Sequence, residues 1–450
     1  MRYLPHTKQS REAMLEAIGV SSIDQIFKDA GAPQIALDDF ALPKHLSEME
    51  VERHMAALAA QNRAAGAGPF FVGCGAYKHH VPASVDHLIQ RSEFLTSYTP
   101  YQPEISQGTL QYLFEFQTQV AALLGGEIAN ASLYDGSTGC GEAVLMAHRL
   151  TRRKKAVLAG NLHPQYGAVV KTLSDMSGFE VVDGTVTPGG VEDLSTLIDD
   201  ETSCVVVQTP DIFGTLHDLT KIAETAQAKG ALLIAVVTEV VSLGAVKSPG
   251  SMGADIIVAE GQSIGNGLNF GGPYLGLLAT RHKFVRQMPG RVCGETVDAD
   301  GERGYVLTLS TREQHIRREK ATSNICTNSG LCCLAFTIHM TLLGEKGLTK
   351  LSRLNHAKAV QLSQQLAEIE GVTLLNDQFF NEFTLKLEGR DAAEVTAQLA
   401  AKDILAGVPG GRLWPERDDV KDLLIVAVTE TVTDADFDAL VAGLKEALNA

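Results

Sequence analysis

Three short apolar runs decide the fold: Cys204-Val205-Val206-Val207, Leu232-Leu233-Ile234-Ala235-Val236-Val237 and Asp255-Ile256-Ile257-Val258. They carry almost no polar alternation, which is typical of strands in a sheet whose two faces are both covered. A helical pattern from Leu219 to Lys229 separates the first two runs. Strand, helix and strand in this order form a βαβ unit, so we expect a parallel sheet.

The same alternation extends outward in both directions. Similar runs occur at 156–159, 179–182 and 274–279. We therefore expect a large α/β domain over residues 67–330, with a mostly parallel sheet. The final 120 residues instead combine two long helical patterns, three apolar runs and a helix that begins at Thr433. They predict a small C-terminal α+β domain over residues 331–450.

Residues 1–66 predict an N-terminal helical arm. Ser10 to Ile18 form a short amphipathic pattern that Gly19 closes, and Ser22 caps a second one over 23–27. Ser47 and Glu50 have the spacing of a capping box before a third helix. Helices this short bury little surface alone, so we expect the arm to pack on another domain or subunit.

Composition narrows the function classes. The 450 residues carry a formal net charge of −16, which disfavours nucleic acid or an anionic membrane as the main partner. Seven dispersed cysteines without a CxxC pair predict neither a disulfide framework nor a zinc site, and His79-His80 alone is too small a set of metal ligands. The N-terminus lacks a signal-peptide pattern and no apolar run approaches a membrane span, so we expect a cytoplasmic protein.

A glycine-rich segment, Tyr134-Asp135-Gly136-Ser137-Thr138-Gly139-Cys140-Gly141-Glu142-Ala143, leads into a helix. Free backbone N–H groups and the hydroxyls of Ser137 and Thr138 at a helix N-terminus suit a phosphate or another anion. An ordinary glycine-rich helix entry gives the same pattern. The segment is not a P-loop, because no Gly-Lys-Ser/Thr follows it.

Two further polar segments follow predicted strands. His163 comes directly after the run at 156–159, where it could stack on a flat ring or face solvent. Gln208 to Gly214 follow the run that ends at Val207, and they suit an active-site loop or an ordinary turn. The carboxyl ends of parallel strands line the ligand crevice in doubly wound sheets, so both segments lie where a site is expected.

The order of these segments resembles that of fold type I pyridoxal phosphate enzymes. That fold implies an acid at the end of the 232–237 strand and a lysine after the 255–258 strand, which forms a Schiff base with the cofactor. The only nearby acid is Glu239, which lies beyond the expected position, and no lysine occurs between Lys247 and Lys283. The chain therefore predicts the architecture of such an enzyme without its covalent anchor.

Tyr98-Thr99-Pro100-Tyr101-Gln102-Pro103-Glu104-Ile105-Ser106-Gln107-Gly108 is an irregular segment rich in hydrogen-bonding side chains. It closely resembles a signature of the N-terminal half of the glycine dehydrogenase P-protein family. Residues 311–327, Thr-Arg-Glu-Gln-His-Ile-Arg-Arg-Glu-Lys-Ala-Thr-Ser-Asn-Ile-Cys-Thr, resemble a second signature of that half, and Asn130-Ala131-Ser132-Leu133 also matches. The resemblance runs essentially from end to end.

The resemblance implies a reaction and its partners. P-proteins act in the glycine cleavage system, where they bind glycine through pyridoxal phosphate, release CO2 and pass the aminomethyl group to the lipoyl arm of H-protein. In the split form of the family, a second subunit carries the lysine and its cofactor. The length of this chain resembles subunit 1 of that form, and a heterotetramer of two pairs is what the family implies.

The resemblance also suggests site residues. We expect Tyr98, Tyr101, Gln102, Glu104 and Gln107 to contribute to the shared site from across the interface. Arg317, Arg318, Lys320 and Asn324 are candidates to contact the glycine carboxylate or the carrier protein. Structural roles remain open for both groups, as packing residues, ion-pair partners or a helix cap. Ser137, Thr138 and His163 are expected to line a vestigial pocket, and His79-His80 either the mouth of the shared site or a surface loop.

Two other function classes remain open. A self-sufficient cofactor enzyme would use Lys247 or Lys283 as its Schiff-base lysine. A non-enzymatic scaffold would bind a partner or H-protein and leave the partner's turnover unchanged.

Overall fold

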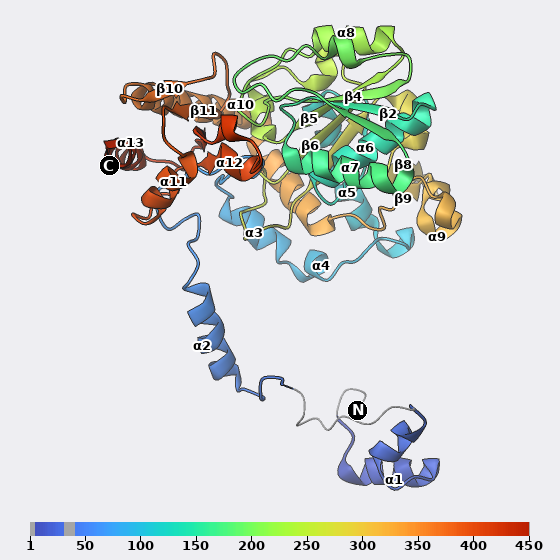
Figure 1. Ribbon diagram of the computed structural model, residues 1–450. Helices are drawn as coiled ribbons and strands as arrows, with labels where there is room; N and C mark the ends of the chain where they lie inside the picture. The colour runs from blue at the N-terminus through green and yellow to red at the C-terminus, as the bar shows by residue number, and fades with distance from the viewer. Residues whose placement is uncertain (1–4, 31–40, 450) are drawn as a thin grey trace. The chain divides into compact units, whose positions relative to one another are not determined.

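The computed structural model describes residues 5–30 and 41–449, and the chain divides into two compact units between residues 63 and 64. The first unit contains α1 (Lys8–Ile18), the 3-10 helix η1 (Ile23–Ala30) and α2 (Glu48–Ala59), shown in blue in Figure 1. Thr7 caps α1 and Gly19 ends it at a φ of 84°. The Glu50 carboxylate accepts a hydrogen bond from the Ser47 backbone N–H at 2.8 Å, as the predicted capping box requires.

A seven-stranded sheet forms the centre of the second unit. Its strand order is β1-β7-β6-β5-β4-β2-β3, and the five strands from β2 to β6 run parallel. Only β7 runs antiparallel to its neighbours β6 and β1. The strands are β1 (Ile128–Ala129), β2 (Lys155–Leu158), β3 (Glu180–Asp183), β4 (Thr202–Gln208), β5 (Leu232–Val237), β6 (Ile256–Glu260) and β7 (Gly276–Thr280). The predicted α/β fold with a mostly parallel sheet is confirmed.

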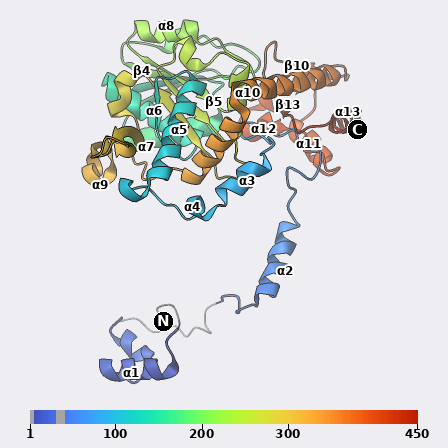
Figure 2. The same cartoon turned by 180° about the vertical axis from the view of Figure 1, so that it is seen from behind.

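The apolar runs of the sequence have a simple explanation in the packing. Along β4 and β5 successive side chains enter two different cores, so both faces of each strand are buried. Val205 and Leu233 join the core under α5 (Gln107–Leu124) and α8 (Thr220–Ala228). Val206 and Ile234 join the opposite core under α6 (Gly136–Thr151) and α7 (Pro164–Ser177). Figures 1 and 2 show these helices on the two faces of the sheet.

Several short elements complete the large part of this unit. They are α3 (Ala83–Ile89), α4 (Ser92–Leu95), η3 (Pro103–Ile105), η4 (Leu194–Leu197), η5 (Val240–Gly244), η6 (Pro249–Met252), η7 (His282–Gln287), η8 (Ser310–Arg312), α9 (Gln314–Arg317) and η9 (Arg318–Lys320). A hairpin of β8 (Val292–Val297) and β9 (Arg303–Thr308) lies outside the main sheet. This hairpin was not predicted from the sequence, because its strands mix apolar and polar residues and are only partly buried.

The C-terminal part has its own antiparallel sheet and its own core. Strands β10 (Val372–Leu374), β11 (Glu382–Leu387), β13 (Leu423–Ala427) and β12 (Val408–Pro409) are ordered β10-β11-β13-β12. The helices α11 (Ala392–Ala400) and α13 (Asp434–Asn449) pack on this sheet, and α12 (Gly410–Leu413) and η10 (Asp418–Val420) connect its strands. Residues Pro69 to Phe71 pair with this part of the chain through Leu405 and Ala427.

The two helices predicted near 331–343 and 351–369 both lie within α10 (Gly330–Ala367), where a non-helical Gly344 with a φ of 57° and a ψ of −177° separates them. Its length and apolar composition are sufficient for a membrane span. However, Phe336 and Leu348 of α10 belong to the core under the large sheet, while Leu362 and Leu366 belong to the core of the small one. We therefore describe α10 as a core helix that links the two sheets (Figure 2).

Candidate functional site

The two signature segments lie against each other, although more than 200 residues separate them in the chain. The hydroxyls of Thr99 and Thr327 are hydrogen-bonded at 2.7 Å. The Arg291 guanidinium donates to Tyr101 Oη at 3.3 Å and to the Cys326 carbonyl at 2.8 Å, so it touches both segments at once. The sequence resemblance named these segments separately, and the tertiary structure makes them one surface.

The third matching segment, residues 130–133, and the adjacent Tyr134 bind the backbone at Cys326 and Ser329. Tyr134 Oη accepts a hydrogen bond from the Cys326 backbone N–H at 3.0 Å. Ser132 Oγ accepts one from the Ser329 N–H at 3.2 Å. The segment from Cys326 to Ser329 is therefore held between residues 130–134 and the loop at 98–107.

Much of the loop at 98–107 faces outward. Tyr98 is 75% exposed, Tyr101 56% and Ile105 81%. Gln102 and Glu104 are also exposed. Large apolar side chains that gather on a surface mark an interaction site more often than scattered ones do. The predicted residues Tyr98, Tyr101, Gln102 and Glu104 thus lie together on the outside of the chain.

Gln107 has a different position from the other predicted residues. Its side-chain amide donates to the Pro103 carbonyl at 2.7 Å and to the Tyr305 carbonyl at 2.9 Å. Its Oε1 accepts from the Tyr305 N–H at 2.8 Å. The side-chain amide of Gln107 thus pairs with the Tyr305 backbone as a residue of a neighbouring strand would. Gln107 therefore fixes the first turn of α5 to β9.

The predicted basic residues are exposed beside this surface. Arg317 ends α9, Arg318 and Lys320 form η9, and Asn324 follows four residues later. In the described part of the chain, no carboxylate lies within ion-pair distance of Arg317, Arg318 or Lys320. Their charges are therefore available to an outside partner.

The helix N-terminus at Gly136 is already occupied by carboxylates of this chain. Asp135 accepts a hydrogen bond from the Thr138 N–H at 2.6 Å, and the hydroxyls of Ser137 and Thr138 both donate to it. Glu260, at the end of β6, accepts from the Gly136 N–H at 2.9 Å. A side chain at Gly136 would also collide with the Tyr166 hydroxyl, at 2.2 Å.

The electrostatics of Glu260 oppose a phosphate at this helix. Burial raises the pKa of Glu260 to about 8, even though hydrogen bonds from the Leu275, Gly136 and Gln262 N–H groups favour its charged form. A phosphate placed here would lose these donors and would face Glu260 and Asp135 at short range. The residues present therefore do not fit the phosphate of pyridoxal phosphate.

His163 is buried and engaged, so it is not a surface loop residue. Its Nδ1 accepts from the Gln165 N–H at 3.2 Å, and its Nε2 lies 3.1 Å from the Cys74 carbonyl. Burial lowers its pKa. The imidazole ring packs on Tyr166 with centroids 5.3 Å apart. The structure thus uses His163 to hold residues 74 and 163–166 together.

Glu239, the acid after β5, takes part in a buried ion network. His79 Nε2 lies 2.8 Å from Glu239, and His79 Nδ1 lies 2.8 Å from Glu430, which follows β13. Burial by itself would lower the pKa of His79, but the two carboxylates outweigh it and raise the pKa to about 10. His79 therefore connects the two sheets, whereas the neighbouring His80 side chain is exposed.

The lysines of the self-sufficient alternative lie on the surface. Lys247 is exposed in the loop before η6. Lys283 is exposed on η7, with its ammonium over the Phe284 ring at 4.8 Å. Neither side chain reaches the end of β6, where Glu260 accepts its three backbone hydrogen bonds. This arrangement does not favour either residue as an internal cofactor anchor.

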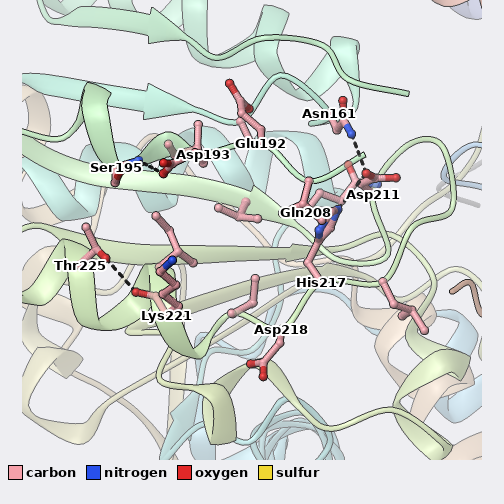
Figure 3. A pocket seen from close by; sticks show the side chains of 17 residues that line it. Asn161, Glu192, Asp193, Ser195, Gln208, Asp211, His217, Asp218, Lys221 and Thr225 are labelled. Atoms are coloured by element: carbon pink, nitrogen blue, oxygen red, sulfur yellow. Dashed lines mark hydrogen bonds and ion pairs between the residues drawn. The ribbon is translucent and has the colours of Figure 1, made fainter. Parts of the chain in front are cut away.

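A cavity of ≈ 470 Å³ lies at the carboxyl ends of β2 and β4. Figure 3 shows Asn161 pointing toward Asp211, and the same wall of the cavity contains the His217–Asp211 ion pair at 2.9 Å. The predicted active-site loop, Gln208 to Gly214, contributes Gln208 and Asp211 to it. None of its lining residues belongs to the two signature segments. Within residues 5–30 and 41–449, no cluster of three or more His, Cys, Asp and Glu side chains could hold a metal ion.

Several residues of this surface were not found from the sequence. Arg291 lies outside every segment quoted above, and Arg312 and Tyr134 lie inside quoted segments without a predicted role, since all three act through contacts with other parts of the chain. Glu260 lies in the stretch between Lys247 and Lys283 that lacks a lysine, and no role was predicted for it. Arg312 donates to the carbonyls of Leu309, Met288 and Gly290 and so fixes the turn that leads into β8.

Comparison of the whole chain with known proteins identifies its family. Residues 1–444 match the family model described as glycine cleavage system P-protein. The chain is 65% identical to the probable glycine dehydrogenase (decarboxylating) subunit 1 of Parvibaculum lavamentivorans and 65% identical to that of Xanthobacter autotrophicus, each over the full length of both chains.

Solved structures agree with this result. A crystal structure of glycine decarboxylase (P-protein) of the glycine cleavage system, in inhibitor-bound form, is similar with a TM-score of 0.89 and 41% identity, over 99% of this chain and 100% of the other. A sphingosine-1-phosphate lyase from Burkholderia pseudomallei shares the fold, with a TM-score of 0.66, 15% identity and 94% of each chain covered. The chain therefore belongs to the glycine cleavage system P-protein family, together with relatives named subunit 1 of glycine dehydrogenase (decarboxylating).

Proposed function

We propose that this chain completes an active site on a second, lysine-bearing subunit and is inactive alone. In the complex, glycine binds through pyridoxal phosphate on the partner's lysine, CO2 leaves, and the aminomethyl group passes to the lipoyl arm of H-protein. One observation carries this proposal. The internal anion position of this chain is filled by Glu260 and Asp135, whereas the signature residues Tyr98 and Tyr101 face outward.

The exposed loop supplies groups for binding and orientation. The phenols of Tyr98 and Tyr101 and the amide of Gln102 can donate hydrogen bonds, and the Glu104 carboxylate can accept them. Placed over an opening on another subunit, the two aromatic rings would also exclude water. Exclusion of water strengthens every electrostatic contact inside the site. Gln107 contributes indirectly, because it fixes the start of α5.

Further exposed apolar groups support a large partner surface. Phe270, in the glycine-rich loop before β7, is 78% exposed, and Leu331 at the start of α10 is also exposed. A cavity of ≈ 350 Å³ lies between α3, this loop and α10. In the first unit, α1 and α2 bury none of their residues. We infer that these surfaces bind the partner in a heterotetramer of two pairs, and that the complex works in the cytoplasm.

The test is reconstitution. This chain, the lysine-bearing partner and their mixture are each supplied with pyridoxal phosphate, glycine and lipoylated H-protein, and exchange of labelled CO2 into glycine is measured. We expect exchange only in the mixture.

The other outcomes favour the alternatives. Exchange by this chain alone would make it a self-sufficient enzyme that uses Lys247 or Lys283. Full exchange by the partner alone would make this chain a scaffold or a regulator.

The basic residues give a second prediction. H-protein brings its lipoyl arm to the site to accept the aminomethyl group, so we propose that Arg317, Arg318 and Lys320 attract acidic groups on that carrier. Replacing all three by alanine is expected to raise the KM for lipoylated H-protein about fivefold at low salt, with kcat nearly unchanged. Exposed ion pairs contribute roughly 0.2–1 kcal/mol each, and salt screens them.

A matched control distinguishes the effect of these three cations from the effect of the net charge of the chain. Lys346, Lys350 and Arg353 are three exposed cations on α10, and their triple alanine variant has the same net charge. It should leave the KM for H-protein as in the wild type. An equal effect of the two variants would refute a local docking role. A rise in the KM for glycine alone would instead assign the basic residues, with Asn324, to the substrate carboxylate.

A further inference from the structure

Arg291 joins the two signature segments, residues 98–108 and 311–327. It is 3% exposed and lies directly before β8. Its Nη2 bonds to Tyr101 and Cys326, and its guanidinium carbon lies 4.9 Å from the centroid of the Tyr101 ring. Its Nε lies 3.6 Å from the Glu313 carboxylate. One buried cation therefore contacts residues 101, 313 and 326.

The hydrogen bonding of Arg291 is incomplete. Its Nε and Nη1 have no hydrogen-bond partner, and neither has Oε1 of Glu313. Unsatisfied buried polar groups are costly, and in a native protein they call for an explanation. Arg312 shows that this part of the fold can satisfy a buried arginine fully, since all three of its side-chain nitrogens donate to backbone carbonyls. The site of Arg291 is thus not optimised for stability.

The contact has a definite effect on Tyr101. Because Tyr101 Oη accepts a hydrogen bond from Nη2, its own proton points in another direction. The ring rests against the guanidinium while more than half of the residue stays exposed. Arg291 thus fixes the ring and leaves the phenol O–H as a donor to a group outside this chain.

We propose that Arg291 is a positioning residue of the shared active site, which holds Tyr101 so that its hydroxyl donates a hydrogen bond across the subunit interface. This proposal rests on the proposed function and deepens it, since it states how one contributed side chain is oriented. Arg291 itself is buried and does not reach the substrate. Its effect on the reaction passes through Tyr101 and through the Cys326 segment.

A double-mutant cycle in the reconstituted complex tests this role. The variants are Arg291→Met, Tyr101→Phe and the double variant, assayed by CO2 exchange at saturating partner and carrier. We expect each single variant to lower kcat by roughly tenfold to hundredfold, because a displacement of about 1 Å in a positioned group can cost on the order of 10² in rate. The double variant should be no slower than the slower single variant, since both changes remove the same interaction.

Arg312→Met is the matched control, because Arg312 is a buried arginine of the same region that does not contact Tyr101. Its effect on kcat should multiply with that of Tyr101→Phe. Arg291→Lys keeps the cation near the ring and should recover part of the rate. It also serves as the variant for the cycle if Arg291→Met does not fold.

The outcomes separate this proposal from the proposed function. If the wild-type mixture shows exchange but the effects of Arg291→Met and Tyr101→Phe multiply, Arg291 only stabilises the fold and the positioning role is wrong. If Arg291→Met has full activity, the role is wrong as well. If the partner alone shows full exchange, the proposed function itself fails before the cycle is measured.

Discussion

Replacing His79 by alanine is expected to lower the free energy of unfolding by about 3–5 kcal/mol, the cost of breaking a buried ion pair by removing one partner. The His79 side chain is 2% exposed and lies between Glu239 and Glu430. Without the imidazolium, two carboxylates remain close together near the core. The measurement is the unfolding midpoint of the full chain in urea.

His80→Ala is the matched control, because only the backbone N–H of His80 bonds to Glu430 and its side chain is exposed. It should leave the midpoint unchanged. An equally stable His79→Ala variant would contradict a charged bridge between the two sheets.

The bridge also predicts a pH dependence. The pKa of His79 is raised from 6.5 to about 10 in the folded chain, so its contribution to stability is full below pH 6.5 and is lost as the pH rises toward 10. The pKa of Glu430 is lowered to about 2, since His79 outweighs the effect of burial. Its contribution is full above pH 4.5 and is lost toward pH 2. In His79→Ala the loss of stability between pH 6.5 and 10 should be much smaller than in the wild type.

The second large effect is expected at Glu260. Glu260→Ala leaves the N–H groups of Gly136, Gln262 and Leu275 without partners in the core. Each unsatisfied buried donor costs about 1–3 kcal/mol, and the costs do not add fully. We expect a loss of about 3 kcal/mol or more in the free energy of unfolding, again measured in urea.

Glu260→Gln separates the hydrogen bonds from the charge. Its amide retains an acceptor oxygen, so the loss of stability should be smaller than in the alanine variant. Burial raises the pKa of Glu260 from 4.5 to about 8, so the wild type loses stability as the pH rises through this interval. The glutamine variant should lack that part of the dependence. Glu224→Gln, an exposed change on α8, should retain it, and a glutamine variant that keeps the full pH dependence would refute the assignment to Glu260.

His79 and Glu260 bind the groups that the fold of a pyridoxal phosphate enzyme would present to its cofactor. The sheet is that of a cofactor enzyme, but the acid after β5 is bound to His79 and the helix N-terminus after β1 is bound to Glu260. Glu239 and the Gly136 N–H, which could bind a cofactor, instead bind other groups of this chain. The side chains of Tyr98, Tyr101, Gln102 and Glu104 in the 98–107 loop remain exposed.

Sequence by itself determined the elements that depend on near neighbours. The apolar runs at 204–207 and 232–237 predict strands buried on both faces, and the Ser47–Glu50 spacing predicts a helix start, because side-chain period and capping act within a few residues. The helical patterns at 331–343 and 351–369 predict two helices, and the non-helical conformation of Gly344 separates them within α10. The two signature segments were recognised from their residue order alone.

Tertiary structure decided every contact between distant residues. His79 meets Glu239 and Glu430 across 160 and 351 positions of the chain, and no local pattern marks such a pair. Arg291 joins Tyr101 to Cys326 in the same way, and Glu260 takes the place that Gly136, Ser137 and Thr138 predict for an anion. The physical reason is that burial, charge pairing and hydrogen-bond satisfaction depend on which groups the folded chain brings within a few ångströms, whereas a sequence pattern reports only on its own element.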